Sequence, residues 1–310
     1  MCGCRIHLAQ GYTLHFGACA ESRPPGARHR ADFHLRRVPK GGDGGLWRAS
    51  FCGCLVPGPL CKGGDLCAAY QPLLQYRDNL DNRSMLVIGV DGCKGGWVAA
   101  ALGDSNTVSV TVHKKFADLL SAADGASWIG VDIPIGLPAD GVREADRLAR
   151  IVLLPTGRAN SVFITPPREA LEADTHAQGS AICKRLTGVG MSQQAYALRK
   201  KIFEVAPLAA EDPRIFEVHP EVSFFELTRE FDPPVLLPSK KTWHGMWARW
   251  NALQDADVVV PTALGAGGLS ACDDVLDAAV AARTARRKLR GLARSLPAEP
   301  ESSRTPTIWY

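Results

Sequence analysis

The chain has 310 residues, of which 46% are hydrophobic and 22% charged, as is typical of a globular protein with one large or two ordinary domains. No apolar run reaches the length of a membrane span and no signal-peptide pattern opens the chain, which predicts a cytoplasmic protein without a membrane partner. The first 84 residues hold 11 Lys and Arg against 6 Asp and Glu, whereas the remainder holds 25 against 26. The near-zero charge of the larger part argues against strong non-specific binding of nucleic acid.

Residues 1–84 are rich in Gly, Pro, Arg and Cys and show no sustained helical or strand periodicity. Two Cys-x-Cys pairs leave a small zinc module or a disulfide-rich secreted module open, but no C-x₂-C pair with a matching second half is present. We therefore interpret residues 1–84 as a disordered extension or a start assigned too far upstream, with Met85 as the natural beginning. The expected domain then covers residues 85–297, and residues 298–310 form a tail.

The first part of the domain contains two apolar runs, residues 87–91 and 128–132, that each end in an aspartate. Residues 87–102 predict a strand, a glycine turn and a returning strand, with Asp91 at the end of the first strand. A third strand is expected over 108–113, a helix over 116–123, and a buried strand over 128–133 that contains Asp132. If the two aspartate strands are neighbours, the carboxylates repel unless a cation or a proton intervenes, which favours a divalent metal site. The structural alternatives are a turn role for Asp91 and a capping role for Asp132.

The following stretch is mainly helical. Arg143, Asp146, Arg147 and Arg150 share one helix face, which favours a solvated, ion-paired surface; phosphate contacts by Arg143 and Arg150 are the alternative. Ser192 is expected to cap a helix that runs through Ile202.

Residues 214–225 are predicted to form an unusually polar strand. Glu217, His219 and Glu221 alternate, so they would share one face of an extended segment. That face belongs either to a solvated edge strand or to the site.

The last third of the domain supplies further charged candidates. Lys240 and Lys241 suit a phosphate contact, and they precede Trp243, Trp247 and Trp250, whose helical spacing predicts packing residues. A long helix is expected from about residue 270, with Asp273 and Asp274 in its first turn, where acids complement the helix dipole. Asp277 lies deeper on an alanine-rich face, where an unpaired carboxylate would be costly. Either Asp277 or Asp274 is therefore expected to belong to the site.

Five motifs in this order carry a resemblance to a known family. They are residues 90–97 (VDGCKGGW), 131–137 (VDIPIGL), 161–163 (SVF), 217–221 (EVHPE) and 274–278 (DVLDA). Over residues 85 to about 297 the chain resembles the domain of unknown function 429 family, which is predicted to be ribonuclease H-like nucleases. The resemblance implies an α/β fold: a ribonuclease H-like mixed five-stranded sheet flanked by helices, with a helical insertion between the fourth and fifth strands.

The resemblance also implies a metal-dependent nuclease that hydrolyses the phosphodiester bonds of nucleic acid by a two-metal mechanism. Asp91, Asp132, Glu217 and Asp277 would be catalytic, and these residues with Glu221 and Asp274 would hold Mg²⁺ or Mn²⁺. Lys240, Lys241, Arg143 and Arg150 would contact phosphate. Two alternatives remain: a phosphotransferase of the sugar-kinase and actin type, which would need a second copy of the domain, and a non-catalytic binding protein whose acids pair with Lys or Arg.

Overall fold

The computed structural model describes residues 85–229, 236–300, 302 and 305–310, together with the backbone of four short strands nearer the N-terminus. The chain divides into two compact units, Met1–Gln75 and Tyr76–Tyr310. In the first unit, β1 (Arg5–Leu8) pairs antiparallel with β2 (Tyr12–His15), and β3 (Phe33–Val38) with β4 (Leu46–Phe51). The other residues of 1–84 lie outside the described residues, and so does the expectation that this segment is a disordered extension or a start assigned too far upstream.

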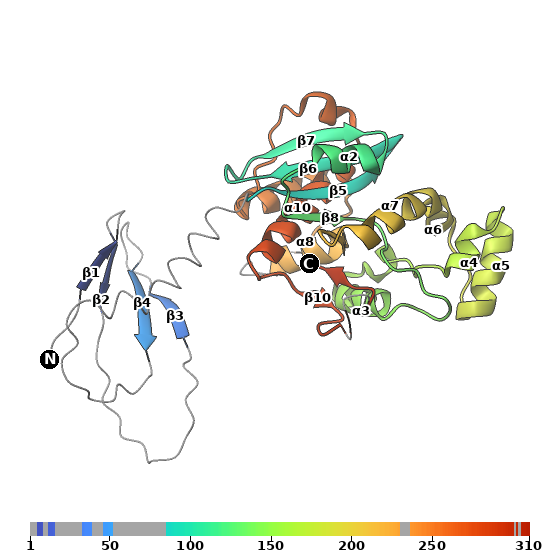
Figure 1. Ribbon diagram of the computed structural model, residues 1–310, viewed down its shortest axis with the longest axis horizontal. Coiled ribbons are helices and arrows are strands. Elements are labelled where there is room, and N and C mark those ends of the chain that lie inside the picture. The colour runs from blue at the N-terminus through green and yellow to red at the C-terminus, as the bar shows by residue number, and fades with distance from the viewer. Residues whose placement is uncertain are drawn as a thin grey trace, which may run out of the picture. The chain divides into compact units, whose positions relative to one another are not determined.

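Within the described residues, a mixed sheet of seven strands in the order β10-β11-β9-β8-β5-β6-β7 is the framework of the second unit (Figure 1). Three strands form an antiparallel meander: β5 (Val87–Cys93), β6 (Gly96–Leu102) and β7 (Val108–His113). β8 (Trp128–Val131) pairs parallel with β5, and β9 (Ile215–Val218) pairs parallel with β8. The predicted α/β class, the first hairpin and the third strand are confirmed.

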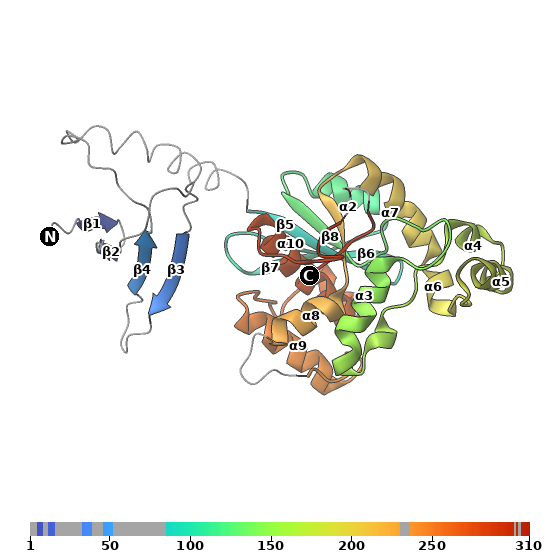
Figure 2. The ribbon, with the colours of Figure 1, turned by 90° about the horizontal axis from the view of Figure 1, so that it is seen from below.

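Helices cover both faces of the sheet because its central strands are apolar on both sides. In the hairpin, Val98 and Ala100 face one core, whereas Trp97 and Ala99 face the other. The first core includes α10 (Cys272–Leu289), and the second includes α2 (Phe116–Ala122) and α7 (Arg199–Glu211). Figure 2 shows α2 and α7 above the sheet, and α3, α8 and α9 below it.

The long helix α10 lies against β5 at unusually short range. A Cβ atom on Gly89 would stand 2.0 Å from the carbonyl oxygen of Ala278 and 2.1 Å from the amide nitrogen of Ala282. Only glycine on the strand and alanine on the helix permit such an approach. This contact sets the position of Asp277, which directly precedes Ala278.

A helical insertion separates β8 from β9, as predicted. Its larger helices are α3 (Glu144–Leu153), α5 (His176–Thr187) and α7. The short elements between them are η1 (Leu154–Thr156), η2 (Ala159–Ser161), α4 (Arg168–Glu172) and α6 (Gln193–Ala197). Ser192 caps α6 by accepting a hydrogen bond from the amide of Ala195, which confirms the predicted cap, but the helix is interrupted at Leu198 before α7 begins.

Two short strands extend the sheet beyond the five that were predicted. β11 (Ile308–Trp309) pairs parallel with β9, and β10 (Ser295–Leu296) pairs antiparallel with β11. The expected tail thus contributes a strand, and Ile308 is buried in it. A run of two residues shows no alternation, so the sequence pattern could not reveal these strands.

The predicted polar strand over 214–225 is wrong in its second half. β9 ends at Val218, and α8 (Pro220–Arg229) begins two residues later. Proline at the first helical position has a backbone angle suited to a helix start. Glu217 and Glu221 therefore lie on different elements and do not share a strand face.

The remaining elements are α9 (Trp243–Asp255) and η3 (Gly265–Leu269), which precede α10. Among the described residues, no helix is long and apolar enough to cross a membrane.

Candidate metal site

Three aspartates come from three different elements of the second unit. Asp91 is the fifth residue of β5, Asp132 follows the last residue of β8, and Asp277 lies in the second turn of α10. The register of the parallel pair sets Val90 opposite Val131, and the amide of Asp132 donates to the carbonyl oxygen of Val90 at 2.9 Å. The two strand aspartates are thus neighbours, as predicted, and α10 adds the third.

The three carboxyl groups converge. Each offers an oxygen atom, and these atoms lie within 4.8 Å of one another. Asp277 is fully buried, Asp91 is 9% exposed and Asp132 is half-buried. Of the two helix acids left open by the sequence, Asp277 is the one that joins this group, which we call the acidic triad (Asp91, Asp132 and Asp277).

Concentrated negative charge in a buried place disfavours ionisation of the acidic triad. Burial, and then the neighbouring carboxylates of Asp132 and Asp277, raise the pKa of Asp91 well above its usual value. Burial and the Asp277 carboxylate raise the pKa of Asp132 to about 8. Burial raises the pKa of Asp277 to about 6, although the Lys240 ammonium opposes this. A bound cation would relieve the repulsion that these shifts reflect.

Lys240 supplies the positive charge nearest to the acidic triad. Its ammonium donates to Oδ2 of Asp277 and also attracts Asp132 and Asp91. Although burial disfavours the ammonium, the Asp277 carboxylate raises the pKa of Lys240 above its usual value. One ammonium neutralises one of three carboxylates, so ionisation of all three leaves two negative charges uncompensated.

Oδ1 of Asp277 is the atom that best indicates a further ligand. It is buried and has no hydrogen-bond partner. A buried carboxylate oxygen without a partner loses its hydration and gains nothing in return. Three carboxylates with one free, buried oxygen fit the all-oxygen ligand sets of Mg²⁺ and Mn²⁺.

The carboxylate of Glu217 is fully engaged by hydrogen bonds within the fold. Its carboxylate accepts from both terminal nitrogens of Arg143, at 2.6 and 2.9 Å, and from the amide of Ile135 at 2.7 Å. Arg143 also binds Asp146, whose other oxygen accepts from the amide of Thr165 at 2.8 Å. This buried network fixes the loop that follows Asp132, and it leaves Glu217 outside the acidic triad.

Glu221 is also engaged by an arginine. Arg249, which is fully buried, donates to both carboxylate oxygens of Glu221 at 2.8 and 3.1 Å. The same guanidinium donates to the carbonyl oxygen of Pro238 at 2.8 Å. The pair therefore holds the segment that leads to Lys240, and it has a positioning role toward the acidic triad.

The predicted solvated face of α3 is wrong for its N-terminal part, because Arg143 and Asp146 are buried, although they do form an ion pair at 2.6 Å. Arg147 does pair with Glu144 at 2.5 Å on the surface. Arg150 donates to the carbonyl oxygen of Val162 at 2.7 Å. Arg143 and Arg150, which were both considered for phosphate binding, thus already have partners within the fold.

The remaining charged residues considered from the sequence are Asp274 and Lys241. Asp274 is half-buried, and its charge contributes to the raised pKa of Asp91. Burial, followed by repulsion from Asp273, raises the pKa of Asp274. Lys241 is exposed and binds Asp273.

Two further residues lie near the site: Lys201, which the sequence patterns did not single out, and His219, which they placed on the face shared with Glu217 and Glu221. Lys201 of α7 donates to the carbonyl oxygen of Gly96, and its ammonium lies 4.2 Å from the ring centre of Trp97. A Cβ on Gly92 would meet the Lys201 side chain at 2.8 Å, so the lysine passes directly over the residue after Asp91. Burial lowers the pKa of His219 to about 4, and its Nδ1 is buried without a partner. Lys201 is distant from the triad in the sequence and stands in no motif that marks it, whereas His219 belongs to the EVHPE motif of residues 217–221.

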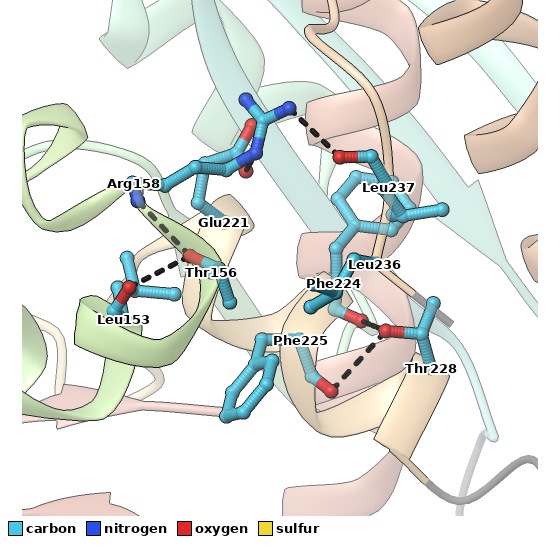
Figure 3. Close-up of a pocket in the computed structure, with 9 residues that line it drawn as sticks. All are labelled: Leu153, Thr156, Arg158, Glu221, Phe224, Phe225, Thr228, Leu236 and Leu237. Carbon is cyan, nitrogen blue, oxygen red and sulfur yellow. Dashed lines mark hydrogen bonds and ion pairs between the residues drawn. The ribbon is translucent and has the colours of Figure 1, made fainter. Parts of the chain in front are cut away.

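A small pocket lies next to the Glu221 side chain (Figure 3). Arg158 crosses it, donating to the carbonyl oxygen of Leu237 at 2.8 Å and lying 3.7 Å from a carboxylate oxygen of Glu221. Phe224 and Leu236 contribute apolar walls. None of the three aspartates lines this pocket, and its interactions support the segment that leads to Lys240.

Comparison with known proteins places the chain in a family without a defined activity. Residues 89–302, more than half of the chain, match a family model described as a protein of unknown function, DUF429. No curated protein and no solved structure matches the chain. The matched region contains Asp91, Asp132 and Asp277, and the chain therefore belongs to the DUF429 family of proteins of unknown function.

Proposed function

We propose that this protein is a metal-dependent, ribonuclease H-like nuclease that hydrolyses phosphodiester bonds of nucleic acid. The acidic triad carries the proposal, because two buried carboxylates and one half-buried carboxylate, with oxygen atoms within 4.8 Å of one another, are unfavourable to assemble unless a cation binds there. The resemblance to the ribonuclease H-like fold supports it, since one acid comes from the first hairpin, one from the fourth strand and one from the last long helix.

Asp91, Asp132 and Asp277 would hold Mg²⁺ or Mn²⁺. A second ion would draw on Asp274, whose charge acts on Asp91 and which takes no part in the buried arginine networks of Glu217 and Glu221. When bound, such ions activate water and stabilise the leaving oxygen of a phosphodiester. The protein itself supplies the rigid arrangement, in which Gly89 sets the helix against the strand and Arg143 fixes the loop after Asp132.

Lys240 and Lys241 would take a second role in this proposal. Their ammonium groups bind Asp277 and Asp273. A cation at the acidic triad would compete with Lys240 for the same carboxylate and release its ammonium toward the substrate phosphate. Such backbone contacts position a nucleic acid without reading its sequence.

The ion pair between Lys240 and Asp277 also favours a second candidate function, a non-catalytic binding protein. In that case the lysine would be the permanent partner of the triad. The partnerless Oδ1 of Asp277 and the excess of negative charge argue for the nuclease.

Hydrolysis of end-labelled single-stranded RNA and DNA with Mg²⁺ or Mn²⁺ tests the proposal. We expect cleavage by the wild-type chain and its loss in Asp91→Asn and Asp132→Asn. Asp104→Asn, at an exposed position away from the triad, is the matched control and should cleave normally. Cleavage that persists in both triad variants, or that needs no divalent ion, would refute the proposal.

A further inference from the structure

Helix α9 carries three tryptophans stacked along one side. The rings of Trp243 and Trp247 lie 6.1 Å apart and 7° from parallel, and those of Trp247 and Trp250 lie 4.9 Å apart and 14° from parallel. The helical spacing predicted packing residues, which is wrong for two of them: Trp243 is 69% exposed and Trp247 is 47% exposed. Trp250 does pack against the core, and its indole donates to the carbonyl oxygen of Val260 at 3.0 Å.

The stack is held in a fixed orientation. Thr242 caps α9 by accepting from the amide of Gly245 at 3.1 Å. A Cβ on Gly245 would stand 1.9 Å from the carbonyl oxygen of Ser239, so the first turn of α9 packs directly on the backbone before Lys240. Exposed tryptophans that are already parallel and anchored offer a planar surface at little further entropic cost.

The tryptophan stack is joined to the acidic triad by a very short stretch of chain. Lys241 and Lys240 are two and three residues before Trp243, so their Cα atoms lie within about 7 and 11 Å of it. Their side chains reach Asp273 and Asp277 on α10. A planar apolar surface beside two ammonium groups matches the two parts of a nucleotide, a base and a phosphate.

From these observations we propose that Trp243, at the exposed end of the stack, stacks an unpaired base of a single-stranded nucleic acid while Trp247 supports its ring, which rests on the nuclease proposed above and names its substrate class. Stacking on aromatic rings requires a base with a free face, which a continuous duplex does not present. Stacking also explains how a domain of near-zero net charge would bind nucleic acid without a strongly basic groove.

Fluorescence anisotropy of labelled oligo(dT) and oligo(U) tests this, with the full chain kept in EDTA so that no hydrolysis occurs. We expect Trp243→Ala and Trp247→Ala each to weaken binding about tenfold, and the corresponding Phe variants to retain most of it. Leu292→Ala is the matched control, because it removes an exposed apolar side chain elsewhere, and it should bind as the wild type does. A duplex of the same length should bind no more weakly to the Ala variants than to the wild type.

Two results would overturn the inference. One is equal loss of duplex and single-strand binding in the tryptophan variants, or no loss of either. The other is the absence of oligonucleotide binding by the folded wild type up to about 10⁻⁴ M, whether or not it sediments with anionic lipid vesicles. Failure of the nuclease proposal can be told apart from failure of this inference. Loss of cleavage contradicts only the nuclease, because the binding measured in EDTA does not depend on cleavage.

Discussion

Replacing Asp132 by Asn should stabilise the metal-free protein, and the gain should increase with pH. In the folded state the pKa of Asp132 is raised from 3.8 to about 8 by burial and by the Asp277 carboxylate. Between these two values the folded state holds a proton that the unfolded state has lost, so the stability of the wild type falls as the pH rises. Asn has no proton to lose and does not carry this cost.

The size of the effect follows from the shift. At pH 7 the raised pKa lowers the free energy of unfolding of the wild type by about 4 kcal/mol, because each pH unit between 3.8 and 7 contributes about 1.4 kcal/mol. The Asn variant does not lose this free energy. A buried amide without full hydrogen bonding costs about 2 kcal/mol, which leaves a net gain of about 2 kcal/mol. At pH 5 the two contributions nearly cancel, so the difference between variant and wild type should grow by 2 to 3 kcal/mol, roughly, from pH 5 to pH 7.

Urea unfolding in EDTA at pH 5, 6, 7 and 8 measures this difference. Tryptophan fluorescence reports on the second unit, because six of the seven tryptophans lie between Trp97 and Trp309. Asp104→Asn serves as the control and should follow the wild type at every pH. A variant that is no more stable than the wild type at pH 7 and 8 would refute the electrostatic reasoning.

Three further predictions concern the surroundings of the triad. Lys240→Met should bind Mn²⁺ at least tenfold more tightly than the wild type by calorimetry, because no ammonium competes for the carboxylates; unchanged affinity would contradict this. Glu217→Gln should lower the free energy of unfolding by about 3 kcal/mol in urea, since it leaves Arg143 buried without its main counter-charge, and a loss below 1 kcal/mol, roughly, would argue against that role. Gly89→Ala should prevent stable folding, because its Cβ would overlap the backbone of α10 at 2.0 Å, whereas Gly103→Ala, with nothing within 4 Å, should leave the melting temperature nearly unchanged; a folded, stable Gly89 variant would contradict the close approach.

The strands that carry two of the aspartates were predictable because their signals are local. The apolar runs before Asp91 and Asp132 mark buried strands, and neighbouring strands that end in the same direction bring such residues together. Asp277 was expected from its place on an alanine-rich helix face. Its choice over Asp274 needed the structure, because the rotation of α10 is set by the contact with Gly89.

The parts that were not predicted depend on contacts between distant segments. Nothing in the sequence near Glu217 indicates that Arg143, 74 residues earlier, binds it. The pairing of Lys240 with Asp277 spans 37 residues and is equally invisible to local patterns. The spacing of Trp243 and Trp247 predicts a helix, but the same spacing fits a buried or an exposed face, and only the packing of α9 decides between them.

The helix start at Pro220 is a different case, because its signal was present in the sequence. Proline in the first turn favours a helix, whereas the alternating Glu217, His219 and Glu221 favour a strand. The helix begins at Pro220, so the alternating residues are divided between β9 and α8.

Calorimetric titration of the full chain with Mn²⁺ tests the central claim most directly. The account predicts binding by the wild type and by Asp104→Asn, with release of protons at pH 7, because a ligand carboxyl group that is protonated at that pH must ionise. It predicts that Asp91→Asn abolishes this binding while the protein stays folded. A folded wild-type chain that binds no Mn²⁺, or an Asp91→Asn variant that binds it equally well, would contradict the account.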